Sequence, residues 1–192
     1  MKDVKCYMKK LLSLLLVTCV LFSFSACNLN YLDAETTSTT KEQTTEPEIE
    51  LCGPYDVVRV VDGDTIIIDL DGQKTRVRFA NIDTPESVAP EDTGKVNTEE
   101  GVEASDYTKN LLPSGSKVYL EYDEKRTDKY DRVLAYIYLE DGETMIQRLL
   151  LKDGMAKVYN DHNNTRYTDE FYRLQDGAKA SGLGIWKDSS NG

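Results

Sequence analysis

The sequence predicts an α+β domain built on a small closed barrel of five strands, with three helices packed outside it. Three observations lead to this fold class. Short β-branched segments are separated by turn residues, a helical pattern follows the third segment, and two more helical patterns follow the fifth. The chain has 192 residues, of which 40% are hydrophobic. We therefore expect one domain with its own core, and we exclude a fibrous or fully disordered chain.

The first three strands form a predicted meander. Residues 57–61 and 65–70 are β-branched runs joined by an Asp-Gly-Asp turn, and a second Asp-Gly turn leads into residues 75–80. Alternation along the third run places Arg76 and Arg78 on one face of the strand and apolar residues on the other. Two arginines on one face indicate a barrel surface that binds anions.

A helix and two further strands are expected next. Thr98 can cap a helix over residues 99–112, which Pro113 ends. Residues 118–122 and 133–139 alternate between apolar and polar positions, as strands with one buried face do. The remaining expected elements are a helix after the capping-box pattern Thr144-x-x-Gln147, which Gly154 ends, and a last helix that begins at Thr168. An OB-fold is the natural candidate for this order of elements.

The first 50 residues are predicted to lie outside the fold. Residues 1–26 have a basic start and an apolar run that ends in small residues before Cys27, which is typical of a lipoprotein signal peptide. A retained transmembrane helix is the alternative, but the run is shorter than the roughly 20 residues that a span needs. Residues 27–50 form a Thr- and Glu-rich tether with too little apolar content to fold. The folded domain is expected over residues 51–192.

This organisation predicts where the protein works. A lipid on Cys27 would attach the chain to a membrane, so we expect an exported protein that is a cell-surface lipoprotein or is secreted. Cys6 and Cys19 would leave with the signal peptide and Cys27 would be lipidated, which leaves Cys52 alone and the mature domain without an intrachain disulfide. No obligate protein partner is implied, and a monomer is expected.

Carboxylates concentrate at the ends of two predicted strands. Asp62 and Asp64 lie in the first turn, and Asp83, Thr84 and Glu86 follow the third strand. Carboxylate and carbonyl oxygens without Cys or His neighbours suit Ca²⁺ or Mg²⁺ rather than zinc. If strand pairing brings the two ends together, Asp64 and Asp83 can share one cation. Taken alone, an Asp-Gly-Asp turn is also an ordinary turn sequence.

Basic and aromatic residues occur together over residues 126–132, between the fourth and fifth strands. Such side chains can hold phosphate while the rings stack on bases or sugars, although a short charged run is more often a solvated turn. The chain has 34 acidic and 23 basic residues and a net charge of −11, which repels a polyanion at long range. Because salt screens exposed charges beyond about 8 Å, a local basic cluster can still bind nucleic acid.

Seven segments of this sequence resemble the staphylococcal-type nucleases, also called thermonucleases, in order and approximate spacing. They are residues 61–65, 78–86, 103–105, 126–132, 134–138, 154–158 and 184–186. The resemblance covers nearly the whole span from residue 57 to residue 186. It implies an OB-fold barrel with three helices and an enzyme that uses Ca²⁺ to hydrolyse phosphodiester bonds of DNA and RNA. It also implies products that end in 3′-phosphates.

The resemblance implies roles for the acidic residues. Asp64 and Asp83 resemble the calcium carboxylates, and Thr84 resembles the residue whose carbonyl is a calcium ligand. Asp62 resembles an outer-shell acid. Glu86 resembles the residue that activates or orients the attacking water, a task that a carboxylate within reach of the water can perform.

The resemblance implies roles for basic and aromatic residues as well. Arg78 and Arg132 resemble the pair that contacts the scissile phosphate, where planar guanidinium groups can stabilise the charge that develops in the transition state. Lys129 and Tyr130 resemble substrate contacts, and Tyr159 is assigned to one of the substrate-contacting tyrosines.

The sequence departs from the family at a few positions. Asp131 stands where the family usually has glycine, which puts a negative charge beside Arg132. Glu91, Asp92, Glu99 and Glu100 give the region after Glu86 an acidic rim. Two other classes of function therefore stay open, namely a catalytically weak OB-fold module that binds nucleic acid and a calcium-stabilised surface module.

Overall fold

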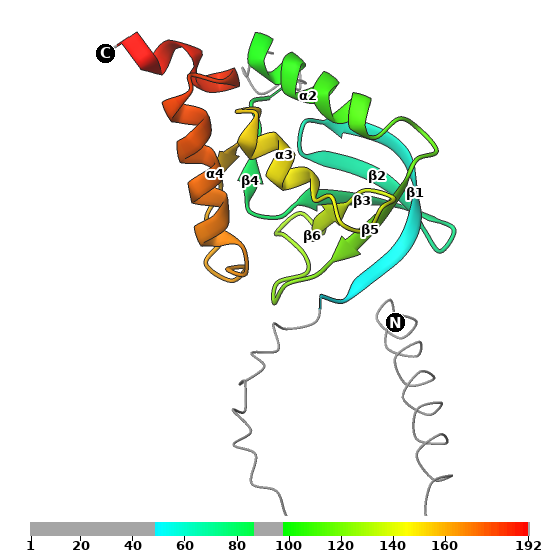
Figure 1. The fold of residues 1–192 in the computed structure, drawn as a ribbon. Coiled ribbons are helices and arrows are strands. Elements are labelled where there is room, and N and C mark those ends of the chain that lie inside the picture. Colours follow the sequence, from blue (N-terminus) through cyan, green and yellow to red (C-terminus); the bar gives the residue numbers. More distant parts are fainter. Residues whose placement is uncertain (1–48, 87–97, 192) are drawn as a thin grey trace, which may run out of the picture. The chain divides into compact units, whose positions relative to one another are not determined.

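A computed structural model of the chain describes residues 49–86 and 98–191, with the backbone alone for residues 188–191. Residues 49–192 form one compact unit (Figure 1). The predicted signal peptide, Cys27 and most of the tether lie outside the described residues, as do Glu91 and Asp92 of the acidic rim.

The described part contains a closed barrel of five strands, as the sequence predicts. Their order around the barrel is β1-β2-β3-β6-β5. The strands are β1 (Leu51–Asp62), β2 (Thr65–Leu70), β3 (Gln73–Phe79), β5 (Lys117–Glu121) and β6 (Val133–Tyr138). All neighbouring pairs are antiparallel except β3 and β6, which pair in parallel. The barrel and its three helices confirm the predicted fold class and are consistent with an OB-fold.

The core of the barrel follows from the alternation in the strands. Inward positions such as Ile66, Ile68 and Val77 are fully buried. β1 starts earlier than predicted, at Leu51, and its pairing register shifts at several points. Such bulges bend a strand and increase its twist, which lets one long strand pair with both β2 and β5.

The helix α2 (Glu99–Leu111) begins as the sequence predicts. The Thr98 side chain accepts a hydrogen bond from the Gly101 main-chain N–H at 3.0 Å, and Glu99 and Glu100 lie in the first turn, where the helix dipole favours acidic residues. The buried residues of α2, including Ala104 and Thr108, face the barrel beside β1 (Figure 1).

The predicted capping box before the helix α3 (Ile146–Lys152) is wrong. Met145 is the residue before the first turn, and no side chain caps it. Thr144 instead donates its hydroxyl to Asp141. The Gln147 side chain is fully buried, accepts from the Ile137 N–H at 3.1 Å and donates to the Ala135 carbonyl at 3.0 Å. Gln147 thus joins α3 to the main chain of β6.

The helix α4 (Thr168–Ala180) begins where predicted and packs on α3. A 3₁₀ helix, η1 (Gly184–Asn191), follows it. Two short strands, β4 (Ile82–Asp83) and β7 (Lys157–Val158), form a small antiparallel pair. This pair matters for the site because it holds Asp83 opposite Lys157.

The prediction that Cys52 stays unpaired is wrong. Cys52 is disulfide-bonded. The prediction had counted Cys6 and Cys19 as removed with the signal peptide and Cys27 as lipidated. Among the described helices, none has the length and hydropathy needed to cross a bilayer.

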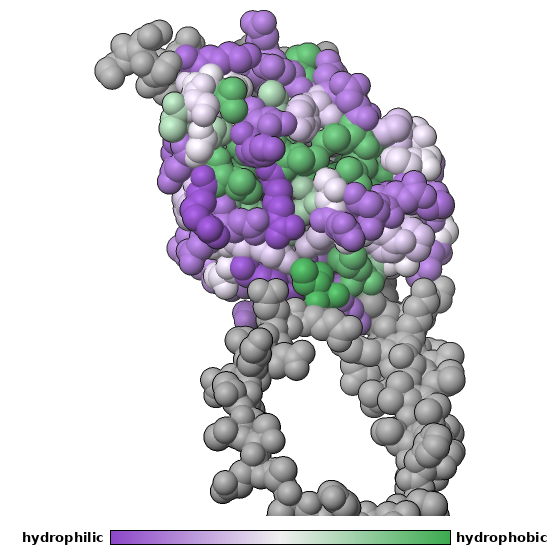
Figure 2. Space-filling view, viewed as in Figure 1, coloured by the Kyte–Doolittle hydropathy of each residue, from purple (hydrophilic) through white to green (hydrophobic). Residues whose placement is uncertain are grey.

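Figure 2 shows apolar residues over the middle of the face that carries α3, with hydrophilic residues around them.

Candidate active site

The pairing of β2 with β3 brings Asp64 and Arg78 together. Thr65 lies opposite Arg78 in the ladder, and the Phe79 N–H donates to the Asp64 main-chain carbonyl at 2.8 Å. The Arg78 Nη1 is 2.6 Å from the Asp64 Oδ2. Asp64 is only 5% exposed, so this carboxylate and the guanidinium meet largely out of contact with water.

Arg78 also reaches the second predicted carboxylate. Its Nη2 donates to the Asp83 Oδ1 at 2.9 Å. One guanidinium thus contacts Asp64 and Asp83 together, and the two carboxylates converge on the same point. The other Asp83 oxygen, Oδ2, lies 3.5 Å from the Lys157 Nζ.

The Asp62-Gly63-Asp64 turn is held closely against Thr84. The Thr84 main-chain N–H and hydroxyl both donate to the Asp64 Oδ2, at 2.9 and 3.1 Å. A Cβ atom on Gly63 would lie 2.7 Å from the Thr84 hydroxyl oxygen, so only glycine fits there. From the other side, the Thr108 hydroxyl of α2 donates to the Gly63 carbonyl at 2.7 Å. The position of Asp64 is therefore fixed by neighbours from three elements.

The electrostatics of the turn disfavour an unpaired negative charge. Burial raises the pKa of Asp64 to about 7, and the neighbouring Asp62 carboxylate contributes to the rise. The Arg78 guanidinium and the Thr84 N–H act in the opposite direction. A buried carboxylate with like-charged neighbours is a group that a further cation would stabilise.

The residues present fit a calcium ion. Asp64 and Asp83 offer carboxylate oxygens that already face one cationic group. In the described part of the chain, no three His, Cys, Asp or Glu side chains form a metal-binding group. A cation here would thus need main-chain carbonyl oxygen, such as that of Thr84, and water besides the two carboxylates, which is the mixed oxygen environment that Ca²⁺ accepts.

Glu86 lies just beyond the carboxylate pair. Its side chain is exposed, and it lines a hollow of about 370 Å³ together with Asp83, Thr84 and Lys157. This hollow, which we call the Glu86 hollow, shares Asp83 with the pocket described next. Glu86 therefore borders the point where Asp83 and Arg78 meet.

A second pocket, which we call the main pocket because most of the predicted site residues line it, has a volume of about 330 Å³. It brings together six of the predicted site residues, namely Arg78, Asp83, Lys129, Tyr130, Arg132 and Tyr159. The parallel pairing of β3 with β6 contributes to this, because Val133 lies opposite Val77, and Arg132 therefore enters β6 beside the part of β3 that carries Arg76 and Arg78. Tyr130 is 66% exposed and Tyr159 is 58% exposed. Both rings are thus available for stacking.

Arg132 is positioned by Asp128. The Arg132 Nε donates to the Asp128 Oδ2 at 2.6 Å, and the main-chain N–H groups of Arg132 and Tyr130 donate to the Asp128 Oδ1. Burial opposes ionisation of Asp128, but these hydrogen bonds outweigh it, and the pKa of Asp128 falls below its usual value. Since the Nε is the atom that Asp128 holds, the outer nitrogens of the guanidinium are left to face the pocket.

Sequence reasoning assigned no role to several residues of the main pocket. Asp128 is one of them. Its carboxylate accepts a hydrogen bond from the main-chain N–H two residues later, as in an Asx-turn, and Asp is a residue that favours such turns. Lys125 and Asp161 are ion-paired at 2.9 Å across the pocket wall. Asn81, which donates to the Asn164 carbonyl, has a left-handed backbone with φ of 62°. The Lys125–Asp161 and Asn81–Asn164 contacts join segments far apart in the sequence, so no local pattern indicates them.

Comparisons with known proteins bear on this site. A family model described as "Staphylococcal nuclease homologue" matches residues 76–188. The chain belongs to the staphylococcal nuclease family. A thermonuclease of Staphylococcus hyicus is 40% identical over 134 residues, which cover 70% of this chain and 76% of that protein. The thermonuclease of Staphylococcus intermedius is 42% identical over 133 residues, which cover 69% of this chain and 76% of that protein.

A further relative in the staphylococcal nuclease family is the endonuclease YncB of Bacillus subtilis. It is 42% identical over 133 residues, which cover 68% of this chain and 60% of that protein. Membership of this family, together with relatives that are nucleases over most of the domain, makes the chain an enzyme that hydrolyses phosphodiester bonds. The predicted membership of the thermonuclease family and the predicted nuclease activity are confirmed.

Proposed function

We propose that this enzyme cleaves DNA and RNA in a calcium-dependent reaction and leaves 3′-phosphate ends. The single observation that carries the proposal is the convergence of Asp64 and Asp83 on Arg78 beside the main pocket. Two carboxylates that face one cation, next to exposed tyrosines and a second arginine, match the needs of a phosphodiester substrate.

Asp64, Asp83 and the Thr84 carbonyl would hold the calcium ion. When bound, the ion would neutralise charge that develops on the phosphate oxygens in the transition state. If the calcium ion balances the negative charge of Asp64 and Asp83, the Arg78 guanidinium no longer has to pair with both carboxylates. Arg78 would then turn its planar nitrogens toward the phosphate, and Arg132, which lines the same pocket, would bind that phosphate as well.

Glu86 would orient the attacking water and accept its proton. It is exposed and borders Asp83, so water can reach it from the Glu86 hollow. The two arginines would stabilise the negative charge on the equatorial oxygens, and one fixed donor of this kind is worth about 2.7 to 4 kcal/mol of barrier. Lys129, Tyr130 and Tyr159 would hold the nucleotide by charge and stacking.

A cleavage assay tests this function. The full chain is incubated with labelled single-stranded DNA and with RNA, in calcium and in a chelator, and the product ends are assigned by phosphatase sensitivity and mass spectrometry. We expect cleavage in calcium alone, with 3′-phosphate products. Glu86→Gln should lose most of the rate, whereas Glu100→Gln, an exposed residue of α2, should keep it. Cleavage that persists in the chelator or in Glu86→Gln would contradict the proposal.

We also propose that the enzyme is exported and carries a lipid on Cys27, as a monomer tethered to the cell surface. The support is the basic start, the apolar run and the small residues that precede Cys27. Mass spectrometry of the N-terminal peptide from membrane fractions tests this. A diacylglycerol-modified Cys27 is the expected result, and an unmodified Cys27 in an intact leader would overturn it.

A further inference from the structure

Arg76 is an exposed cation beside the site that the proposed mechanism does not use. It lies on β3 two positions before Arg78, and the alternation of this strand puts both side chains on the outer face. Arg78 is turned into the carboxylate pair. Within the part of the chain that the structure describes, Arg76 has no hydrogen-bond or ion-pair partner, although acidic residues outnumber basic ones by 34 to 23.

Arg76 lines a hollow of its own, which we call the Arg76 hollow. Its walls are Arg76, Tyr130, Asp131 and Arg132, and its volume is about 480 Å³. Tyr130 and Arg132 also line the main pocket. The main pocket and the Arg76 hollow therefore meet along these two residues. A nucleic acid strand that leaves the main pocket past Tyr130 would enter the Arg76 hollow.

The chemistry of this hollow suits a nucleic acid backbone. A guanidinium binds phosphate oxygens through two parallel hydrogen bonds, and the exposed Tyr130 ring beside it offers a surface for a base. The Lys129 Nζ and the Arg132 Cζ already lie near this ring, at 4.9 and 5.5 Å from its centre. Asp131 is the one acidic wall of the Arg76 hollow, and it forms no ion pair with Arg76 among the described residues.

We propose that Arg76 binds a second phosphate of the substrate, one that flanks the scissile phosphate on the same strand. This proposal rests on the proposed function and extends it by a subsite. Two arginines of β3 then contact two successive phosphates, with Arg78 at the scissile one, together with Arg132 from the start of β6, and Arg76 at its neighbour. The enzyme consequently favours substrates that extend beyond a single phosphodiester bond.

Substrate length and salt test the subsite. We compare the wild type, Arg76→Gln and the matched control Arg173→Gln on a dinucleotide and on a ten-nucleotide strand. Arg173 is exposed on α4, away from both hollows. For Arg76→Gln we expect kcat/KM on the long strand to fall about two- to fivefold more than on the dinucleotide. The slope of log affinity against log salt should become shallower by roughly 0.7 for a single strand.

The outcomes separate the subsite from the proposed function. If the wild type cleaves both substrates but Arg76→Gln loses the same factor on each, or loses no more than Arg173→Gln, the subsite is overturned and the nuclease stands. If the wild type cleaves neither, the proposed function fails. In that case fluorescence anisotropy with the ten-nucleotide strand still decides the subsite, because binding that is unchanged by Arg76→Gln overturns it.

Discussion

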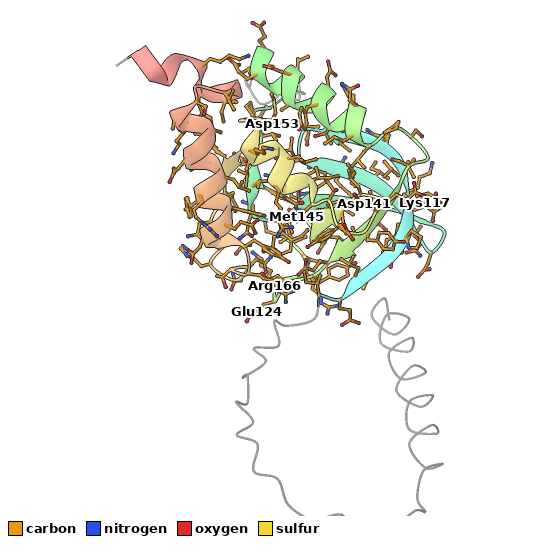
Figure 3. All side chains as sticks on the ribbon, in the orientation of Figure 1. Lys117, Glu124, Asp141, Met145, Asp153 and Arg166 are labelled. Carbon is orange, nitrogen blue, oxygen red and sulfur yellow. The ribbon has the colours of Figure 1, made fainter. Side chains whose placement is uncertain are left out.

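Asp64 and Glu121 are both buried carboxylates, but their surroundings differ. Glu121 is 1% exposed, and its Oε2 accepts from the hydroxyls of Tyr138 and Tyr167 at 2.7 and 2.8 Å. Its other oxygen is ion-paired with Arg166, which precedes α4 and is labelled in Figure 3. Burial and the bond to Glu121 raise the pKa of Tyr138, so this hydroxyl remains a donor. Every neighbour of Glu121 in this cluster donates to it.

Asp64 also accepts hydrogen bonds, from Thr65 and Thr84, but it lies close to other carboxylates. Asp62 and Asp83 are close by, and Arg78 must serve Asp64 and Asp83 together. The pKa of Asp64 rises to about 7 because burial is not fully compensated. Glu121 and Asp64 therefore represent two kinds of buried carboxylate with different roles. One that is surrounded by donors stabilises the fold, and one that is crowded by other acids forms a site for a cation and a reaction.

The largest expected effect is on catalysis at the crowded acid. Arg78→Gln removes the guanidinium that faces both carboxylates and the proposed scissile phosphate. We expect kcat to fall by a factor of about 10² to 10³, because one fixed donor to the transition state is lost. Steady-state cleavage of a ten-nucleotide strand measures this, with Arg173→Gln as the control for a lost surface charge. A kcat equal to that of the control would show that Arg78 serves the fold alone.

The second effect is on stability at the satisfied acid. Glu121→Ala leaves two buried tyrosine hydroxyls and Arg166 without their acceptor, so we expect the free energy of unfolding to drop by about 3 kcal/mol. Urea denaturation measures it. The exposed neighbour Glu124, also labelled in Figure 3, is the control, since Glu124→Ala should change stability by less than about 0.5 kcal/mol. Equal unfolding free energies of the two variants would show that Glu121 does not stabilise the fold.

A smaller effect is expected at the residue that positions Arg132. Asp128→Asn keeps an oxygen for the main-chain N–H groups but loses the charge that holds the Arg132 Nε. A charge-assisted bond becomes a neutral one, so we expect kcat to fall roughly tenfold with little change in unfolding free energy. If the variant loses stability and keeps its kcat, Asp128 belongs with Glu121 as a structural acid.

The smallest effect concerns Asp131, whose backbone is left-handed with φ of 59°. The family usually has glycine there, and glycine adopts this conformation without steric cost. Asp131→Gly should raise the unfolding free energy by less than about 1 kcal/mol, since the entropy of the unfolded chain offsets part of the relief. It should also lower KM by removing a negative charge beside Arg132. Asp131→Asn separates the two causes, because it removes the charge and tolerates the left-handed backbone.

The sequence predicts much of this fold because buried and less buried positions alternate along β2 and β3. Inward positions of β2 and β3 are apolar at every second residue, and the Thr98 cap marks the start of α2 correctly. The capping box before α3 fails because Gln147 bonds the main chain of β6, a tertiary contact that outweighs the local pattern. The disulfide of Cys52 was not predicted, because the other three cysteines were expected to be removed with the signal peptide or lipidated.

The site is predictable in part for the same reason. Strand pairing places Asp64, Arg78 and Asp83 together, so three residues separated by up to 19 positions meet as the turn signals indicate. The role of Asp128 in holding Arg132 depends on a turn conformation that is seen only in three dimensions.

Calorimetric titration of calcium into the full chain tests the central claim most directly, with wild type, Asp64→Asn and Glu121→Gln compared and cleavage followed along the same titration. We expect that the wild type and Glu121→Gln bind calcium and that their cleavage rates rise with occupancy, while Asp64→Asn does neither. Calcium binding by Asp64→Asn with wild-type affinity, or cleavage by the wild type before any calcium is bound, would contradict it.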